Sequence, residues 1–391
     1  MTVIDAIQKF APDLTAFRRD IHAHPELGYQ EQRTADRVAQ ALDSYGVTVH
    51  RGLAKTGVVG TLRRGASPKS LGLRAELDAL PLAELNRFAH RSVHDGRMHA
   101  CGHDGHATML LGAARHLASS GNFDGTVHFI FQPAEEGGGG GDVMVKEGLF
   151  DRFPCDAVFG MHNLPGLAAG KFSIRPGPMM AGAAFFDVTV EGVGGHGAMP
   201  ESAVDPVVVA SHIVTALQSI VARNVRPFDP AVISVTQIHA GDAYNVIPAG
   251  AVMRGTARGF TPETMRLMGE RIARIAADVA SGFGAKATTD YRIIFPPLVN
   301  HEAETRFIAD VAAALVGEDN ILRNGRQLMA SEDFSFMLNA RPGAFLYIGN
   351  GEGEGSCEVH NPNYDFNDAV LPLGASLWAR LVETWLAPSA S

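Results

Sequence analysis

The chain has 391 residues, of which 46% are hydrophobic and 19% are charged, as in an ordinary globular protein long enough for two domains. Its formal net charge of −9 argues against a nucleic acid or an anionic membrane as a partner. The chain has three scattered cysteines, no basic and apolar N-terminal leader, and no 18-residue apolar run. We therefore expect a cytoplasmic protein without disulfides or a transmembrane helix.

The first part of the chain alternates between helices and strands. The hydrophobic pattern predicts helices over residues 4–21, 31–46 and 106–121, and strands that run into loops over 69–81, 125–141 and 156–166. Pro12 is expected to kink or split the first helix. This alternation is typical of an α/β sheet covered by helices, in which ligands bind beyond the carboxyl ends of the strands.

The pattern changes near residue 184. Strands are predicted over 184–195, 231–241, 250–260 and 287–295, and helices over 205–224 and 261–284, with Thr261 as the N-cap of the second helix. Residues 343–368 then repeat the strand, glycine loop and polar cluster of the first part. We therefore predict an α+β unit, residues 184–295, inserted into an α/β domain formed by residues 1–183 and 296–391.

Metal-binding side chains follow several of the predicted strands. The stretch "MHACGHDGH" contains Cys101 and His103, and the stretch "PAEEG" ends another strand with two glutamates. His162 ends a third strand and His360 follows the last one. A single histidine is usually no ligand, but loops at one sheet edge that supply Cys, His and Glu together favour a metal site.

The adjacent glutamates, Glu135 and Glu136, separate a catalytic metal site from a closed structural one. Adjacent residues in an extended turn point in different directions, so one carboxylate can bind metal while the other accepts a proton from water. The alternative is a solvated acidic pair. The glycines at 137–141 argue against it, because they let the backbone pass close to a ligand.

On these residues the chain resembles the aminoacylase/hippurate hydrolase family of di-metal amidohydrolases, which includes the indole-acetyl-amino-acid hydrolases. The matching stretches are "RRDIHAHPELGYQE", "RAELDALPL", "MHACGHDGHATMLLGAA", "FQPAEEGGGG", "GMHNLPG", "GGHGAMP", "NVIP", "RGTAR", "SEDFS" and "HNPNYDFND". The resemblance implies a mixed-sheet catalytic domain of the aminopeptidase/carboxypeptidase type with two divalent ions. It also implies an inserted lid that forms a homodimer and a small-molecule N-acyl amino acid as substrate.

The resemblance also implies a role for each motif residue. The metal ligands would be Cys101, His103, Glu136, His162 and His360. Glu135 would be the general base, Asp78 would support a ligand, and His196 of the lid would stabilise the tetrahedral intermediate. Asn245 and Arg254 match lid positions near the substrate carboxylate. The ligand types suit zinc, nickel or cobalt, and they also allow manganese.

Some positions depart from the family pattern. Glu76 stands where aspartate is usual, and Glu201 stands where a histidine is common, which leaves the substrate preference open. We interpret His22 and His24 as structural residues, His90, His94 and His99 as surface or loop residues, and Cys357 as a bystander.

Two alternative functions remain at this point. The same machinery would also serve a dipeptidase or carboxypeptidase. A catalytically silent metal-binding or amino-acid-binding protein is the alternative from another class, although binding metal requires no spare base such as Glu135.

Overall fold

The computed structural model describes residues 3–353 and 355–388. The chain forms two compact units. Unit 1 comprises residues 1–177, 299–326 and 333–391, and unit 2 comprises residues 178–298 and 327–332. Short strands, β7 (Gly177–Met180) and β14 (Leu298–Asn300), lie in the sequence at two of these boundaries. The sequence also gave no sign that residues 327–332 belong to unit 2.

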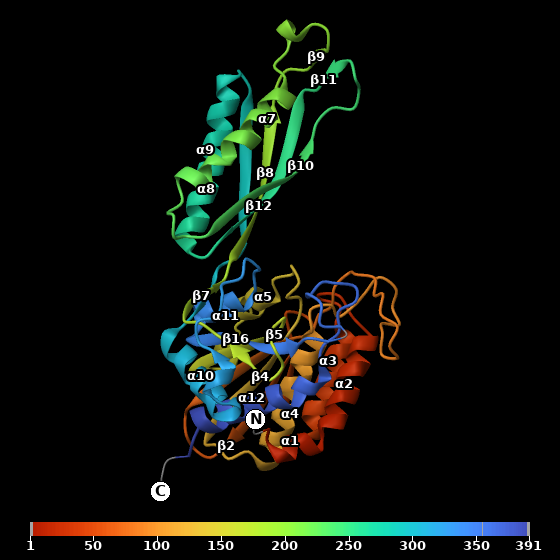
Figure 1. Ribbon diagram of the computed structural model, residues 1–391, viewed down its shortest axis with the longest axis vertical. Helices are drawn as coiled ribbons and strands as arrows, with labels where there is room; N and C mark the ends of the chain where they lie inside the picture. The colour runs from red at the N-terminus through yellow and green to blue at the C-terminus, as the bar shows by residue number, and fades with distance from the viewer. Residues whose placement is uncertain (1–2, 354, 389–391) are drawn as a thin grey trace. The chain divides into compact units, whose positions relative to one another are not determined.

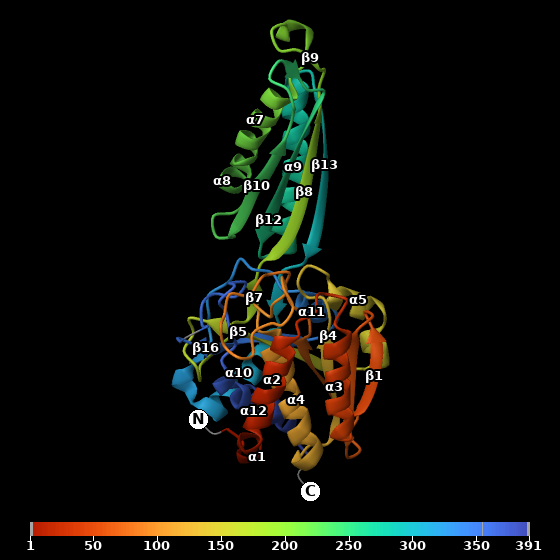
Figure 2. The same cartoon turned by 90° about the vertical axis from the view of Figure 1, so that its right-hand side faces the viewer.

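Unit 1 is built on a mixed eight-stranded sheet (Figures 1 and 2). In sheet order its strands are β1 (Thr48–Leu53), β2 (Gly57–Arg64), β4 (Gly125–Gln132), β3 (Ser70–Glu76), β5 (Ala157–Pro165), β16 (Gly343–Gly351), β6 (Phe172–Ser173) and β15 (Ile321–Leu322). The four central strands β4, β3, β5 and β16 are mutually parallel, so their carboxyl ends lie along one edge of the sheet.

Helices cover this sheet. They are α1 (Asp5–Lys9), α2 (Ala11–Ala23), α3 (Gln32–Ser44), α4 (His103–Ser120), α5 (Gly140–Lys146), α6 (Leu149–Arg152), α10 (Glu302–Val316), α11 (Phe334–Ala340) and α12 (Leu371–Trp385). The first predicted helix is split at Phe10, because α2 begins with Pro12 in its first turn. Helix α4 packs against α2 and α12, and its apolar side chains join those of the strands in one core.

Unit 2 is an antiparallel sheet with helices packed against one face. Its sheet order is β10 (Ala231–His239), β12 (Gly250–Gly259), β8 (Gly182–Glu191) and β13 (Lys286–Phe295). The helices are α7 (Pro206–Leu217), α8 (Ser219–Arg223) and α9 (Pro262–Gly282), and a small ribbon pairs β9 (Gly195–His196) with β11 (Val246–Ile247). Thr261 caps α9 as expected, since its hydroxyl oxygen accepts a hydrogen bond from the Thr264 amide.

One stretch corrects the expectation that no segment is apolar enough to cross a membrane. Pro206–Arg223, which comprises α7 and α8, has a mean hydropathy of 1.3 over 18 residues and meets that condition by length and composition alone. Its buried side chains, among them Val209, Ile213 and Leu217, pack in the core of unit 2. Val207 and Val208 remain exposed on the outer side of α7.

Candidate metal centre

The motif that contains Cys101 and His103 lies at the start of α4. Gly102 adopts a positive φ of 94° as the N-cap residue, and a side chain there would collide with the Asn163 amide. The helix therefore begins at His103, three residues before the predicted start at 106. Both Cys101 and His103 are buried. The backbone turn at Gly102, and not an extended segment, brings these two side chains together.

The other predicted ligands come from the carboxyl ends of the parallel strands. Asp78 follows β3, Glu135 and Glu136 follow β4, His162 lies near the end of β5, and His360 follows β16. Because these four strands are parallel neighbours, the topology brings all of these residues to one edge of the sheet.

Two of the five groups of potential ligand atoms share one cysteine. Those of Cys101, His103 and His162 lie within 4.8 Å of one another, and so do those of Cys101, Glu136 and His360. The Cys101 sulfur is 3.2 Å from Nε2 of His162, and Oε1 of Glu136 is 3.1 Å from Nε2 of His360. This arrangement suits two neighbouring divalent ions with one thiolate between them.

The histidine at the start of α4 is oriented for metal binding. Nδ1 of His103 lies 2.9 Å from the backbone carbonyl oxygen of Asp78 and 3.2 Å from its Oδ1, so Nδ1 carries the proton and donates it. This leaves a lone pair on Nε2, which is buried and has no hydrogen-bond partner among the residues that the structure describes. A buried nitrogen acceptor of this kind fits a metal ligand.

The charges around the two groups favour bound cations. Burial and the carboxylates of Glu136 and Glu135 raise the pKa of the Cys101 thiol well above its usual value. A thiolate at this position therefore requires positive charge nearby. Burial alone would lower the pKa of His103, but Asp78 and the surrounding carboxylates raise it to about 10. The donor set and its charge thus fit two divalent cations.

The turn that carries the paired glutamates is held from both sides. Ala134 has a positive φ of 52°, and its amide donates to the buried carboxylate of Glu31 at 2.9 Å. The backbone amide of Glu136 donates to Oδ2 of Asp78 at 2.9 Å. Glu135 lies outside both cysteine-containing groups, although its carboxylate also lies within 4.8 Å of potential ligand atoms of His103 and Glu136, and it is 4.0 Å from Nε2 of His103. A carboxylate near the ligands but outside these groups is well placed to move protons.

A second row of buried residues supports the ligands, and sequence reasoning missed most of it. His106 lies between Oε2 of Glu76 (2.9 Å from Nδ1) and Oδ1 of Asn163 (2.7 Å from Nε2). Asn163 also donates to the Tyr364 hydroxyl at 2.7 Å, and its carbonyl oxygen lies 2.6 Å from Nδ1 of His162. The second histidine of "GHDGH" and the asparagine after His162 were the available signals.

The histidines of the loop that follows β3 differ in burial. His94 is exposed, whereas His99 lies in the loop as one of the two predicted possibilities and is buried. Nε2 of His90 is 3.0 Å from Oδ2 of Asp365, and its ring stacks on Phe88.

The predicted lid residues all belong to unit 2. His196 pairs with Val246 in the β9–β11 ribbon, and the amide of Gly197 donates to the carbonyl oxygen of Asn245, so the exposed His196 and Asn245 are neighbours. Nδ1 of His196 accepts a hydrogen bond from the Ala198 amide at 3.1 Å, which leaves Nε2 available to a ligand.

The two arginines of β12 differ in their partners. Arg254 is 3.2 Å from the carboxylate of Asp187. Arg258, four residues further along β12, is half-buried and donates to the Ser331 hydroxyl at 2.9 Å. Burial lowers its pKa, and no carboxylate lies within ion-pair distance of it among residues 3–353 and 355–388. Arg258 therefore has more capacity for an added carboxylate than Arg254, and the sequence analysis overlooked it.

Comparison with known proteins agrees with this site. The model of peptidase family M20/M25/M40 matches residues 72–384. The chain belongs to this family.

Individual M20 relatives span nearly the whole chain. A hippurate hydrolase of Campylobacter jejuni is 42% identical over 386 residues, which cover 99% of this chain and 100% of the relative. An N-acetylcysteine deacetylase of Bacillus subtilis is 34% identical and covers 96% of this chain and 97% of its own. The resemblance noted from the motifs is thereby confirmed.

Solved structures confirm the fold class. An aminohydrolase from methicillin-resistant Staphylococcus aureus superposes with a TM-score of 0.92 at 32% identity, over 98% of this chain and 99% of the other. A dinuclear metal-binding M20 peptidase of Bacillus subtilis gives 0.85 at 31% identity, over 97% and 99%. The M20 chain is thus a hydrolase of amide bonds with a mixed-sheet catalytic unit.

Proposed function

We propose that the chain hydrolyses the amide bond of N-acyl amino acids and releases a carboxylic acid and an amino acid. The observation that carries this proposal is the pair of ligand groups sharing Cys101 with a separate carboxylate, Glu135, beside them. The hippurate hydrolase and N-acetylcysteine deacetylase relatives support N-acyl amino acids as the substrate class.

The proposed cofactors are two divalent ions, drawn from zinc, manganese, nickel and cobalt. Cys101, His103 and His162 would hold one, and Cys101, Glu136 and His360 would hold the other. When bound, such ions polarise a substrate carbonyl and lower the pKa of water. The softness of a thiolate ligand favours zinc, nickel or cobalt over manganese.

Residues of the chain would transfer the protons and stabilise the negative charge that develops during the reaction. Glu135 takes a proton from water as the oxygen attacks the amide carbon, and returns it to the amine as the C–N bond breaks. Asp78 holds His103 in the tautomer that leaves Nε2 as an acceptor. The exposed Nε2 of His196 would donate a hydrogen bond to the developing oxyanion.

Recognition of the amino-acid product requires a cationic side chain. The family motifs matched Asn245 and Arg254 to positions near the substrate carboxylate, and we retain both residues as proposed contacts of that group. Arg258 donates to Ser331 but has no carboxylate partner among the described residues, which supports its guanidinium as the partner of the substrate carboxylate.

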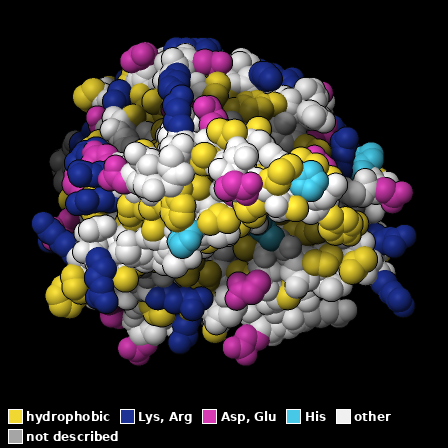
Figure 3. All heavy atoms as spheres, turned by 90° about the horizontal axis from the view of Figure 1, so that it is seen from above, with side chains coloured by type: hydrophobic (Ala, Val, Ile, Leu, Met, Phe, Trp, Pro, Cys, Tyr) yellow, Lys and Arg dark blue, Asp and Glu magenta, His cyan; other side chains and the backbone are white. Residues whose placement is uncertain are grey.

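We further propose that the enzyme is a cytoplasmic homodimer joined through unit 2. The three free thiols support a reducing compartment. The edge strand β10 exposes Val232 and Ile238, and α7 exposes Val207 and Val208, so this side of unit 2 offers an unpaired edge and apolar side chains. Figure 3, a view from above, shows hydrophobic side chains exposed among charged side chains and a few histidines.

In such a dimer, His196 would act at the partner's metal centre. Mixing inactive His196→Ala with inactive Glu135→Gln protein under conditions of subunit exchange should restore activity, because one site of each heterodimer then has both groups. Exchange without recovery would refute action in trans and leave the metal chemistry untouched.

The substrate class is tested with a panel. N-acetyl, N-benzoyl and indole-acetyl amino acids should be hydrolysed by metal-reconstituted protein, and chelation should abolish the activity. Dipeptides in the same panel test the alternative of a dipeptidase or carboxypeptidase. Two bound ions without turnover of any compound would favour the silent binding protein.

A further inference from the structure

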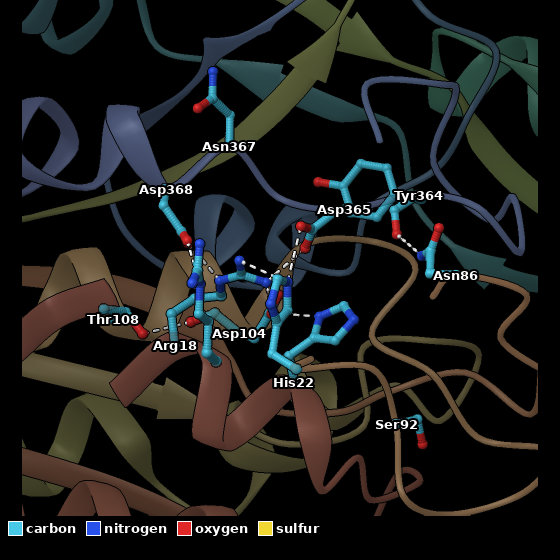
Figure 4. A network of polar contacts seen from close by, with 12 residues as sticks. Arg18, His22, Asn86, Ser92, Asp104, Thr108, Tyr364, Asp365, Asn367 and Asp368 are labelled. Carbon is cyan, nitrogen blue, oxygen red and sulfur yellow. Dashed lines mark hydrogen bonds and ion pairs between the residues drawn. The ribbon is translucent and has the colours of Figure 1, made fainter. Parts of the chain in front are cut away.

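A buried arginine of α2 joins carboxylates from two distant segments. Nη1 of Arg18 is 2.7 Å from Oδ1 of Asp365 and 3.4 Å from Oδ2 of Asp104, and Nε is 2.7 Å from Oδ1 of Asp368 (Figure 4). The Arg18 side chain has no exposed surface. His22, one turn further along α2, is 2.8 Å from Oδ2 of Asp104 and 3.2 Å from Oε1 of Glu84. The metal mechanism proposed above uses none of these residues.

The carboxylates that Arg18 contacts belong to segments that carry proposed ligands of different ions. Asp104 directly follows His103 in the sequence, whereas Asp365 and Asp368 lie five and eight residues after His360. The two segments touch closely, because a side chain at Gly105 would collide with the ring of Phe366. Arg18 therefore bridges the start of α4 and the segment that carries His360.

The two ligand segments differ in how firmly they are held without Arg18. His103 is buried in α4 and bonded to Asp78. The side chain of His360 is 52% exposed, its backbone has a positive φ of 65°, and its amide donates to the Ala100 carbonyl oxygen at 2.7 Å. A non-glycine residue keeps such a conformation only when its surroundings enforce it. Arg18 is one of several external anchors of the residues after His360, which are also held by the bond from Asn163 to Tyr364 and by the pairs of His90 with Asp365 and of Arg19 with Asp368. Among these side chains, Arg18 is the one that also reaches Asp104 at the start of α4.

Geometry explains why an arginine stands at this position. The guanidinium donates hydrogen bonds to Asp368 through Nε and to Asp365 through Nη1, so the positions of both carboxylates are fixed by one side chain. A lysine ammonium would retain the charge but not the planar fork. Buried ion pairs seldom improve stability over apolar packing, because desolvation offsets their attraction. Their value here is better explained by the positions they fix.

We propose that Arg18 is a positioning residue that holds the His360 segment in register with the start of α4, and so sets the affinity of the Cys101–Glu136–His360 group for its divalent ion. This inference rests on the proposed metal centre. The Cys101–His103–His162 group should depend on Arg18 much less, since His103 has its own anchors in unit 1.

The test is a calorimetric titration of metal-stripped full-length protein with Co²⁺, followed also by the thiolate-to-cobalt absorption of Cys101. Wild type should bind two ions. Arg18→Met should bind the first ion with nearly unchanged affinity and the second about 10- to 100-fold more weakly, the usual effect of losing a residue that orients a ligand. Arg18→Lys should lie between the two.

Matched variants separate positioning from general damage. Arg19 is half-exposed and contacts Asp368 but, within the part of the chain that the structure describes, no second carboxylate, so Arg19→Met should weaken the second ion by a smaller factor. Arg115→Met removes a surface pair with Asp13 in the same unit and should change neither ion. If Arg18→Met fails to fold, Asp368→Asn removes the anchor from the opposite side and should give the same selective loss.

The outcomes distinguish this inference from the proposed function. Equal weakening of both ions, or no weakening of the second, in Arg18→Met and Asp368→Asn would overturn the positioning role while wild type still binds two ions. Wild type that binds no ions would refute the metal centre itself, and the positioning role with it.

Discussion

His22 should make the stability of unit 1 depend on pH between neutrality and mild alkali. Burial alone would lower the pKa of its imidazole, but hydrogen bonds to Asp104 and Glu84 raise it from 6.5 to about 9. A group whose pKa is higher in the folded state stabilises the fold fully below its unfolded pKa. That stabilisation is lost as the pH rises through the folded pKa.

The size of the effect follows from these two values. A pKa that moves from 6.5 to about 9 on folding corresponds to about 3 kcal/mol of stability at about pH 6, and to less than about 0.5 kcal/mol at about pH 9. His22→Gln removes the titrating group. The stability difference between wild type and His22→Gln should therefore shrink by about 3 kcal/mol over this pH range.

Urea unfolding followed by tryptophan fluorescence reports on unit 1, which contains His22. Both tryptophans of the chain, Trp378 and Trp385, lie in α12 of this unit. His128→Gln is the matched control. Burial and the nearby His50 lower the pKa of His128 to about 4, so this buried histidine stays neutral throughout and its effect should not change with pH. A stability difference for His22→Gln that is equally constant would refute the assignment of a charged His22.

Further outcomes concern catalysis and metal binding. Glu135→Gln should keep both ions and lose about 10²- to 10⁴-fold in kcat, the usual contribution of a general base, whereas Glu136→Gln should also lose metal by elemental analysis. Near-normal turnover of Glu135→Gln would place the base elsewhere. Cys101→Ala should lower the content of both ions together with activity, because both groups share its sulfur; loss of only one ion would contradict a shared thiolate. Arg258→Ala should raise KM for N-acyl amino acids more than Arg254→Ala does, since Arg254 is already paired with Asp187, and the reverse order would restore Arg254 as the carboxylate partner.

The fold class and the ligand types were accessible from sequence because both depend on local patterns. Buried parallel strands are recognisable in a sequence as apolar runs that end in loops. The residues that follow such strands lie at one edge of the sheet. The exact start of α4 was not accessible in this way. It depends on the positive φ of Gly102, where a side chain would collide with Asn163, and these two residues are 61 positions apart in the chain.

The supporting contacts escaped prediction for a related reason. Arg18 and Asp365 are 347 residues apart, and no local spacing connects them. The same holds for Arg258, whose significance lies in a missing carboxylate partner among the described residues and not in any motif of its own. Helices α10 and α12 were also not assigned, although both are largely apolar on the face that packs into the core.

The order of strands in the sheet of unit 1 has a consequence for synthesis on the ribosome. Strand β16 lies between β5 and β6 in the sheet, yet it is the last strand along the chain and emerges after all of β7 to β13. Unit 2 can therefore complete its own sheet while β5 still has an unpaired, apolar edge. A nascent chain that stalls before Gly343 exposes this edge, which is the kind of surface that chaperones protect from aggregation.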